Sequence, residues 1–169
     1  MTLPRILRAA LLAAVLAAPA SAAAPVRSGV ALDGFQRAFD AAARRHGVGL
    51  SLAREDCGHA VMTACVFRLG GTITIFARAP SLAGEIDDLL LERRAGAGPS
   101  LKATASILVE VFELRRPAGE RKAMIERLLA GTATPGKLAR VDGTTVGFGL
   151  LVDAERGETS VSVGEKLRP

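Results

Sequence analysis

The sequence contains no tryptophan, no tyrosine and no asparagine, and it has only six phenylalanines. Aromatic side chains form the platforms on which sugars and single-stranded nucleic acids stack, so such platforms are hard to build from this chain. The formal net charge of +5 is mild, and two of the contributing arginines, Arg5 and Arg8, lie in an expected leader. A high isoelectric point alone does not indicate nucleic-acid binding. We therefore expect no nucleic-acid partner.

Long hydrophobic runs are lacking too. The apolar run 9–18 has about half of the ~20 residues that a membrane-spanning helix requires. Arg5 and Arg8 precede this run and the small residues 20–22 follow it, which is the three-part pattern of a secretory signal peptide. We interpret 1–22 as a signal peptide and expect a periplasmic or secreted product with no permanent membrane span. An uncleaved amphipathic helix or a buried alanine-rich helix is the alternative.

Cysteine is scarce, with Cys57 and Cys65 the only two in the chain. Paired thiols of an exported protein become disulfides in an oxidising compartment. We therefore predict a Cys57–Cys65 disulfide that fixes a local turn and contributes about 2.5 kcal/mol in the chain-entropy model. An intermolecular disulfide is a further possibility.

A metal site is the alternative use of the two cysteines. Cys57 and Cys65 with His46 and His59 would offer the thiolate and imidazole ligands that suit tetrahedral zinc. The spacing Cys-x-His-x5-Cys matches no common zinc knuckle, and an oxidising compartment favours the disulfide. We expect no cofactor.

Apolar residues recur at helical spacing in three segments, which end at Gly47, Pro117 and Gly131. Ser100 is a suitable N-cap for the second of them. The last two segments adjoin and predict an αα-hairpin. The predicted helices are 31–46, 100–114 and 118–130.

Other segments alternate or carry β-branched runs and so predict strands. Gly70-Gly71 and Asp142-Gly143 are hairpin turn signals. In 72–78 the isoleucine face is expected to point to the core. The segment 85–94 also fits a short helix, but glycine and proline on both sides limit its length and favour a strand. The predicted strands are 48–53, 62–69, 72–78, 85–94, 137–141, 144–152 and 159–163.

The element order predicts an α+β fold in a chain of 169 residues, which suits one domain. We expect an antiparallel sheet of about six to seven strands, covered by an N-terminal helix and a central αα-hairpin. The expected organisation is a flexible N-terminal segment at 23–30 and a single globular α+β domain at 31–165.

Motifs of nucleotide binding and hydrolysis are incomplete. Residues 131–137 match the Gly-x4-Gly-Lys spacing of a phosphate loop, but Leu138 follows where a serine or threonine is required, and the motif is predicted to follow a helix instead of a strand. The sequence has no Gly-x-Ser-x-Gly elbow and no Ser-x-x-Lys. A Ser/His/Asp triad assembled from distant residues would have to use His59 as its base.

Three arginine pairs each end a predicted element. Solvated ends and complements to helix dipoles explain such pairs without a function. If folding gathers the pairs on one face, they form a patch for an anionic partner such as a lipid headgroup, a polyanion or an acidic protein surface. The six residues are Arg44, Arg45, Arg93, Arg94, Arg115 and Arg116.

These observations predict an exported protein that acts through a surface or groove. We expect a non-catalytic binding or accessory module of the cell envelope, whose partner is another envelope protein or an anionic surface. The alternative is a metal-dependent or hydrolytic enzyme centred on His46, Cys57, His59 and Cys65.

Overall fold

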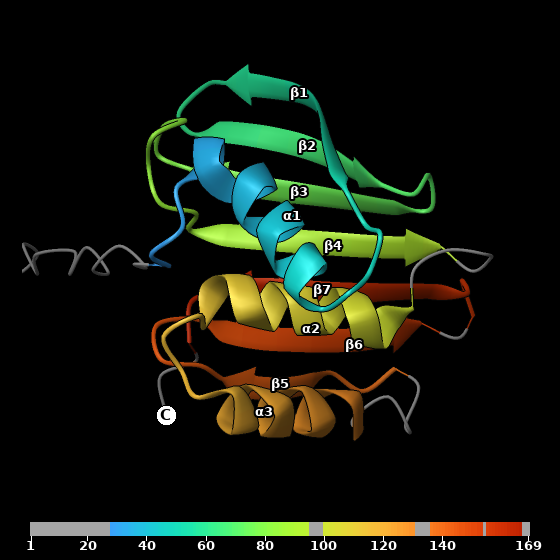
Figure 1. Cartoon of the computed structure of the whole chain (residues 1–169). Coiled ribbons are helices and arrows are strands. Elements are labelled where there is room, and N and C mark those ends of the chain that lie inside the picture. Colours follow the sequence, from blue (N-terminus) through green and yellow to red (C-terminus); the bar gives the residue numbers. More distant parts are fainter. Residues whose placement is uncertain (1–27, 95–99, 131–135, 154, 167–169) are drawn as a thin grey trace, which may run out of the picture.

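The computed structural model describes residues 28–94, 100–130, 136–153 and 155–166. Figure 1 shows an α+β fold, as predicted, with helices packed on a twisted sheet. The helical elements are η1 (Leu32–Gly34), α1 (Phe35–Arg45), α2 (Leu101–Phe112) and α3 (Ala118–Ala130). The strands are β1 (Leu52–His59), β2 (Thr63–Leu69), β3 (Ile73–Ala79), β4 (Asp88–Arg94), β5 (Ala139–Asp142), β6 (Gly147–Asp153) and β7 (Glu158–Gly164).

The seven strands form one sheet in the order β1-β2-β3-β4-β7-β6-β5, and every neighbouring pair is antiparallel. Strands β1 to β4 form one meander and β5 to β7 a second. The last strands of the two meanders, β4 and β7, pair with each other. The first strand of each meander, β1 or β5, therefore lies at an edge of the sheet, and the two last strands lie in the middle. The expected sheet of six to seven antiparallel strands is confirmed.

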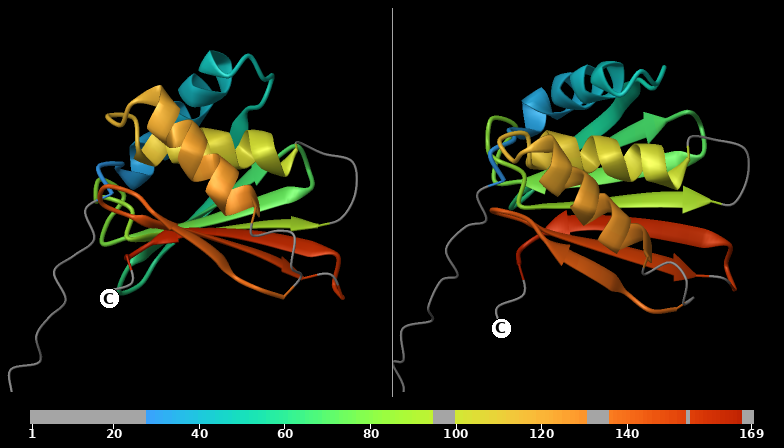
Figure 2. Two further views of the ribbon diagram at one scale, coloured as in Figure 1. Left: turned by 90° about the horizontal axis from the view of Figure 1, so that it is seen from below. Right: turned by 60° about the horizontal axis from the view of Figure 1, so that its bottom comes forward.

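The described helices all lie on one face of this sheet, and we call the opposite side the open face (Figure 2). The core lies under the helices. It includes an aromatic cluster in which the Phe35 ring centroid lies 5.3 Å from that of Phe67 and 6.2 Å from those of Phe39 and Phe112. The isoleucine face of β3 is buried there, as predicted.

Two side chains of α1 fix the start of β1. Gln36 Nε2 donates a hydrogen bond of 2.6 Å to the carbonyl of Leu52, and the Leu52 N–H donates to Asp40 Oδ1 at 2.8 Å. The predicted strand 48–53 is therefore wrong for most of its length, because residues 48–51 form a connection before β1. Its alternating apolar residues are explained by Val48 and Leu50, which pack against the core without joining the sheet.

The Cys57–Cys65 disulfide is present, with its sulfur atoms 2.04 Å apart. It joins directly opposed residues of β1 and β2, so it crosslinks two paired strands. The crosslinked residues flank the short connection between β1 and β2. The sequence predicts no strand between residues 53 and 62, which is wrong, because β1 continues through Cys57 to His59.

Local signals in the sequence set most other boundaries. Ser100 caps α2, since its Oγ accepts a hydrogen bond from the Ala103 N–H at 3.1 Å. Helix α3 spans the predicted 118–130. Gly70 and Gly71 have φ values of 60° and 75°, the left-handed conformation that the predicted hairpin turn requires. The ambiguous segment 85–94 contains the strand β4, which confirms the strand interpretation.

The Asp142-Gly143 turn differs from the prediction. Strand β6 begins at Gly147 instead of residue 144, and the turn is closed by a 2.8 Å hydrogen bond from the Gly143 N–H to the Val146 carbonyl. The cause is Glu113, whose buried carboxylate accepts hydrogen bonds from the Thr144 N–H at 2.7 Å and the Thr144 hydroxyl at 2.8 Å. A side chain from the end of α2 thus shapes a turn 31 residues away.

Candidate functional site

A groove lies between α2 and α3, beside the residue that follows α1. Its volume is about 420 Å³. Ala118 and Ile125 are its apolar lining residues, and the other lining residues are polar or charged. The lining residues are His46, Lys102, Ser106, Glu110, Ala118, Arg121, Lys122, Ile125 and Glu126. A concave site on which several polar groups converge is a candidate binding site.

Glu110 is the central charged group of the groove. Its side chain is only 8% exposed, and three cationic or titratable side chains from two other segments converge on it. Arg45 Nε donates to Oε1, His46 Nε2 lies 2.8 Å from Oε2, and an Arg121 terminal nitrogen lies 3.9 Å from Oε2. The carboxylate therefore ties the end of α1 and the start of α3 to α2.

These contacts change the acidity of Glu110. Burial by itself would raise the pKa of this carboxyl group, because a charge is costly away from water. The hydrogen bond and charge of Arg45, followed by the charges of His46 and Arg121, outweigh burial and hold the pKa of Glu110 below its ordinary value of 4.5. The carboxylate is thus ionised at neutral pH and stabilises the fold.

Replacing Glu110 with glutamine should lower the free energy of unfolding by about 1–2 kcal/mol at pH 7, because charge-assisted hydrogen bonds are lost. A carboxyl group whose pKa is lower in the folded state stabilises the protein above its unfolded pKa and loses that effect as pH falls through the folded value. The difference in free energy of unfolding between wild type and Glu110→Gln should therefore become smaller as pH falls below 4.5. Urea titrations at several pH values measure it.

The matched control is Glu126→Gln on the exposed side of α3. The Glu126 carboxylate has only a 3.9 Å ion pair with Lys122, and both side chains are largely exposed. Exposed pairs contribute little, so the expected change is below about 0.5 kcal/mol at every pH. If the loss of unfolding free energy caused by Glu110→Gln does not depend on pH, the assigned role of the carboxylate is contradicted.

Cations outnumber anions around the groove. Lys102 is exposed, and its ammonium group makes no ion pair or hydrogen bond with any residue that the structure describes. Arg44, at the end of α1 and outside the groove lining, is likewise exposed and unpaired within the described chain. Lys122 is held only by its distant contact with Glu126. These three side chains remain available to an acidic partner.

The four residues of the alternative metal site are not brought together. The disulfide uses both sulfur atoms of Cys57 and Cys65. His46 contacts Glu110, whereas His59 Nδ1 lies 2.6 Å from the Thr63 hydroxyl. No cluster of three or more His, Cys, Asp or Glu side chains in the described ranges is arranged to hold a metal ion. The phosphate-loop match at 131–137 lies mostly outside the described residues.

The three arginine pairs occupy different environments. Arg45 binds Glu110, and Arg116 binds Glu113 at 3.2 Å and Glu120 at 3.3 Å. Arg93 points to the helix side of β4, with a buried Nε that has no hydrogen-bond partner. The pair 93–94 precedes α2 in the chain and the pair 115–116 follows it. A helix of 12 residues is about 18 Å long, so α2 separates these two pairs along the chain.

Several residues of the groove were not predicted from the sequence. Glu110 had a visible signal, since it is a lone acid within the apolar run 107–112. Its partners Arg45 and His46 had been singled out, but for other roles. Lys102, Arg121 and Lys122 look like ordinary surface residues of helices, and only the packing of α3 on α2 shows that they surround one groove.

Comparison of the chain with protein-family models, with curated proteins and with solved structures found no match. Within 28–94, 100–130, 136–153 and 155–166, no helix is long and apolar enough to span a membrane.

Proposed function

We propose that this protein is a non-catalytic binding module of the cell envelope, and that its groove between α2 and α3 binds an acidic, partly apolar segment of another envelope protein. The observation that carries this proposal is a groove of about 420 Å³ that combines the apolar Ile125 with two available cations. Lys102 is unpaired within the described chain, and Lys122 has only a 3.9 Å ion pair with Glu126. Apolar burial supplies affinity in such grooves, and complementary charge supplies orientation and specificity.

The chemistry of the groove supports binding more than catalysis. Its one buried acid, Glu110, already has three partners and a lowered pKa, so it is poorly suited to exchange protons at neutral pH. A general acid or base works best with a pKa near the working pH. The pairing of Glu110 instead supports a structural role, which holds the three helical segments around the groove.

Export is the second part of the proposal. The signal-peptide pattern at 1–22 supports it, and the Cys57–Cys65 disulfide fits an oxidising compartment such as the periplasm. A partner met in that compartment is itself an envelope or secreted protein.

Site-specific photo-crosslinking in cells tests the groove. A photo-reactive residue at Lys102 is expected to capture one predominant envelope protein, and the charge reversal Lys122→Glu is expected to reduce this product about tenfold or more. The control position is Arg127, which is exposed on α3 but does not line the groove. The proposal is contradicted if the photo-reactive residue captures the protein equally from positions 102 and 127. It is also contradicted if Lys122→Glu does not reduce the crosslinked product.

Vesicle binding separates a protein partner from an anionic surface. The purified protein should sediment weakly and equally with anionic phosphatidylglycerol vesicles and with neutral phosphatidylcholine vesicles. The contrary result is strong, salt-sensitive binding to the anionic vesicles that is lost in the double variant Lys102→Glu/Lys122→Glu. It would show that the groove binds an anionic lipid surface and not a protein.

A further inference from the structure

The open face of the sheet has an apolar ridge on one half and a trough on the other. One row of residues crosses all seven strands on this face, because each member is the register partner of the next. In order from β1 to β5 the row is Asp56, Val66, Phe76, Leu90, Ser162, Gly149 and Arg140.

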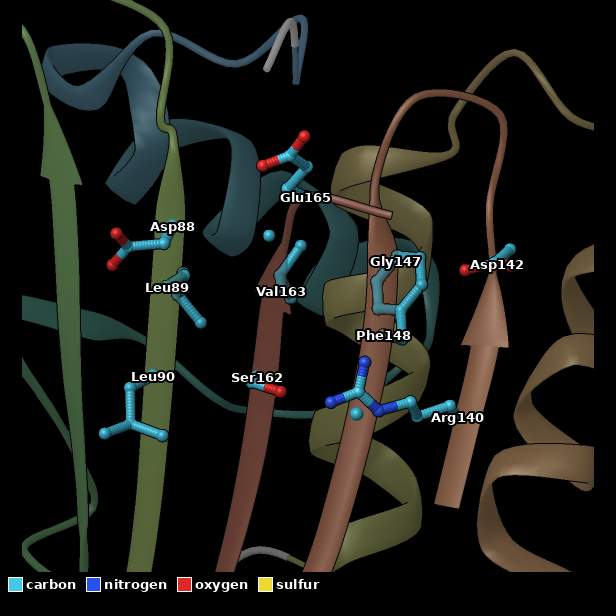
Figure 3. A pocket seen from close by; sticks show the side chains of 12 residues that line it. Asp88, Leu89, Leu90, Arg140, Asp142, Gly147, Phe148, Ser162, Val163 and Glu165 are labelled. Carbon is cyan, nitrogen blue, oxygen red and sulfur yellow. The ribbon is translucent and has the colours of Figure 1, made fainter. Parts of the chain in front are cut away.

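The ridge consists of Phe76 on β3 and Leu90 on β4, which are 39% and 37% exposed. The trough lies on the next two strands, where the row continues with Ser162 and Gly149. It is a depression of about 260 Å³ (Figure 3). A Cβ atom on Gly149 would lie only 2.4 Å from Ser162 Oγ, so the trough depends on the absence of a side chain there.

Arg140 extends into this trough from the edge strand β5. Figure 3 shows its guanidinium turned across β6 toward Ser162. The side chain is exposed and makes no ion pair or hydrogen bond with a described residue. An extended arginine over small residues, without a partner in the described part of the chain, is available to an aromatic ring or a carboxylate from outside.

We propose that the open face binds the open face of a second copy of this chain, forming a two-fold symmetric dimer. The ridge and the trough are each two strands wide, and they lie on either side of the β4–β7 boundary at the same distance from it. A two-fold axis along the strands at this boundary places β3 of one copy over β6 of the other, and β4 over β7. Phe76 then enters the trough over Gly149 of the second copy, and Leu90 lies over its Ser162.

Charges match under the same operation. Strand β2 lies over β5 of the second copy, so Asp56, one strand further out on β1, comes within reach of the free guanidinium of Arg140. Arg78 on β3, which pairs with Asp88 of its own chain, also comes beside Asp142 in the same way. The Phe76 ring also meets the Arg140 guanidinium, which is a cation–π arrangement. A symmetric interface must be complementary to itself, and this face is.

The available area is sufficient for a dimer. Six strands of each copy overlap, since β1 lies outside the axis-related region, and six strands about 4.8 Å wide with about six residues at ~3.3 Å along each give a face of about 600 Å² per copy. Two such faces exceed the ~1,000 Å² in total that a specific interface needs. Two sheets packed face to face in this way form a β-sandwich, the usual arrangement for covering an open sheet face.

Light scattering coupled to size-exclusion chromatography tests the dimer with the wild-type chain from residue 23. At about 100 µM protein, a concentration at which a complex of ~10 µM affinity is mostly formed, the expected mass is that of two copies. Phe76→Asp should raise the dissociation constant about tenfold or more. Leu114→Asp, on an exposed residue outside the open face, should leave it unchanged.

A charge exchange keeps the test independent of folding defects. Arg140→Asp should weaken the dimer, and Arg140→Asp combined with Asp56→Arg should restore it to within about threefold. A monomer at every concentration overturns the proposal. So does a dimer that Phe76→Asp leaves intact, or a charge exchange that restores nothing. None of these outcomes bears on the groove between α2 and α3.

Discussion

Replacing Phe35 with alanine is expected to lower the free energy of unfolding by about 3–5 kcal/mol. The Phe35 ring is fully buried and is the one that contacts all three other rings of the cluster under α1. Its removal deletes a large apolar surface and leaves a cavity between helices and sheet that rigid neighbours cannot fill. Because the chain lacks tryptophan and tyrosine, far-ultraviolet circular dichroism in urea is the suitable measurement.

The same substitution on the open face is the control. Phe76→Ala removes an identical side chain, but the Phe76 ring is already 39% exposed, so less apolar surface returns to water. In dilute protein its expected cost is less than half that of Phe35→Ala. Equal costs would mean that the aromatic cluster under α1 is not the centre of the core.

Replacing Gly143 with alanine is expected to cost about 3 kcal/mol, although alanine ordinarily fits a surface turn well. A Cβ atom at this position would lie 2.0 Å from Glu113 Oε1 and 2.8 Å from the Val146 carbonyl oxygen. The Glu113 carboxylate would have to leave the hydrogen bonds with Thr144 and Arg116 that satisfy its buried charge. A buried charge that loses its partners is strongly destabilising.

A double-mutant cycle identifies the cause. Glu113→Ala should be destabilising by itself, and Gly143→Ala should cost clearly less in that background, because the colliding carboxylate is gone. Gly119→Ala in α3 is the matched glycine control, since an added Cβ there meets nothing within 4 Å. Additive costs for Gly143→Ala and Glu113→Ala would show that the two positions do not act together.

The proposed groove and the proposed dimer use opposite sides of the sheet. The described helices lie on the face opposite the open face (Figure 2), so in a dimer closed at the open faces the helices of both copies point outward, with the residues that line each groove. Two grooves in one assembly would bind a partner with two acidic segments more tightly than one groove would, because the second contact becomes intramolecular.

The candidate site was only partly predictable. Arg45 and His46 stood out in the sequence because three positive or titratable residues end a helix there, but helix-dipole complementarity was a sufficient reason for them. Their actual partner, Glu110, lies 65 residues from Arg45 on another helix. No local pattern relates the two positions, since an ion pair between helices depends on how the helices pack.

The sequence by itself determined what depends on near neighbours along the chain. Helix α3 and the cap of α2 follow from the spacing of apolar residues and from Ser100, and the Gly70-Gly71 hairpin follows from the conformational freedom of glycine. Interactions within one or two turns of the backbone are strong enough to be read from a few residues.

Tertiary structure decided the choice of partners across the fold. The pairing of β4 with β7 joins two segments about 70 residues apart and brings Leu90 beside Ser162, which places ridge and trough on one face. Several strands offer an apolar side that could pair equally well. Only the simultaneous packing of three helices on the sheet selects this order, because burial depends on the whole core at once.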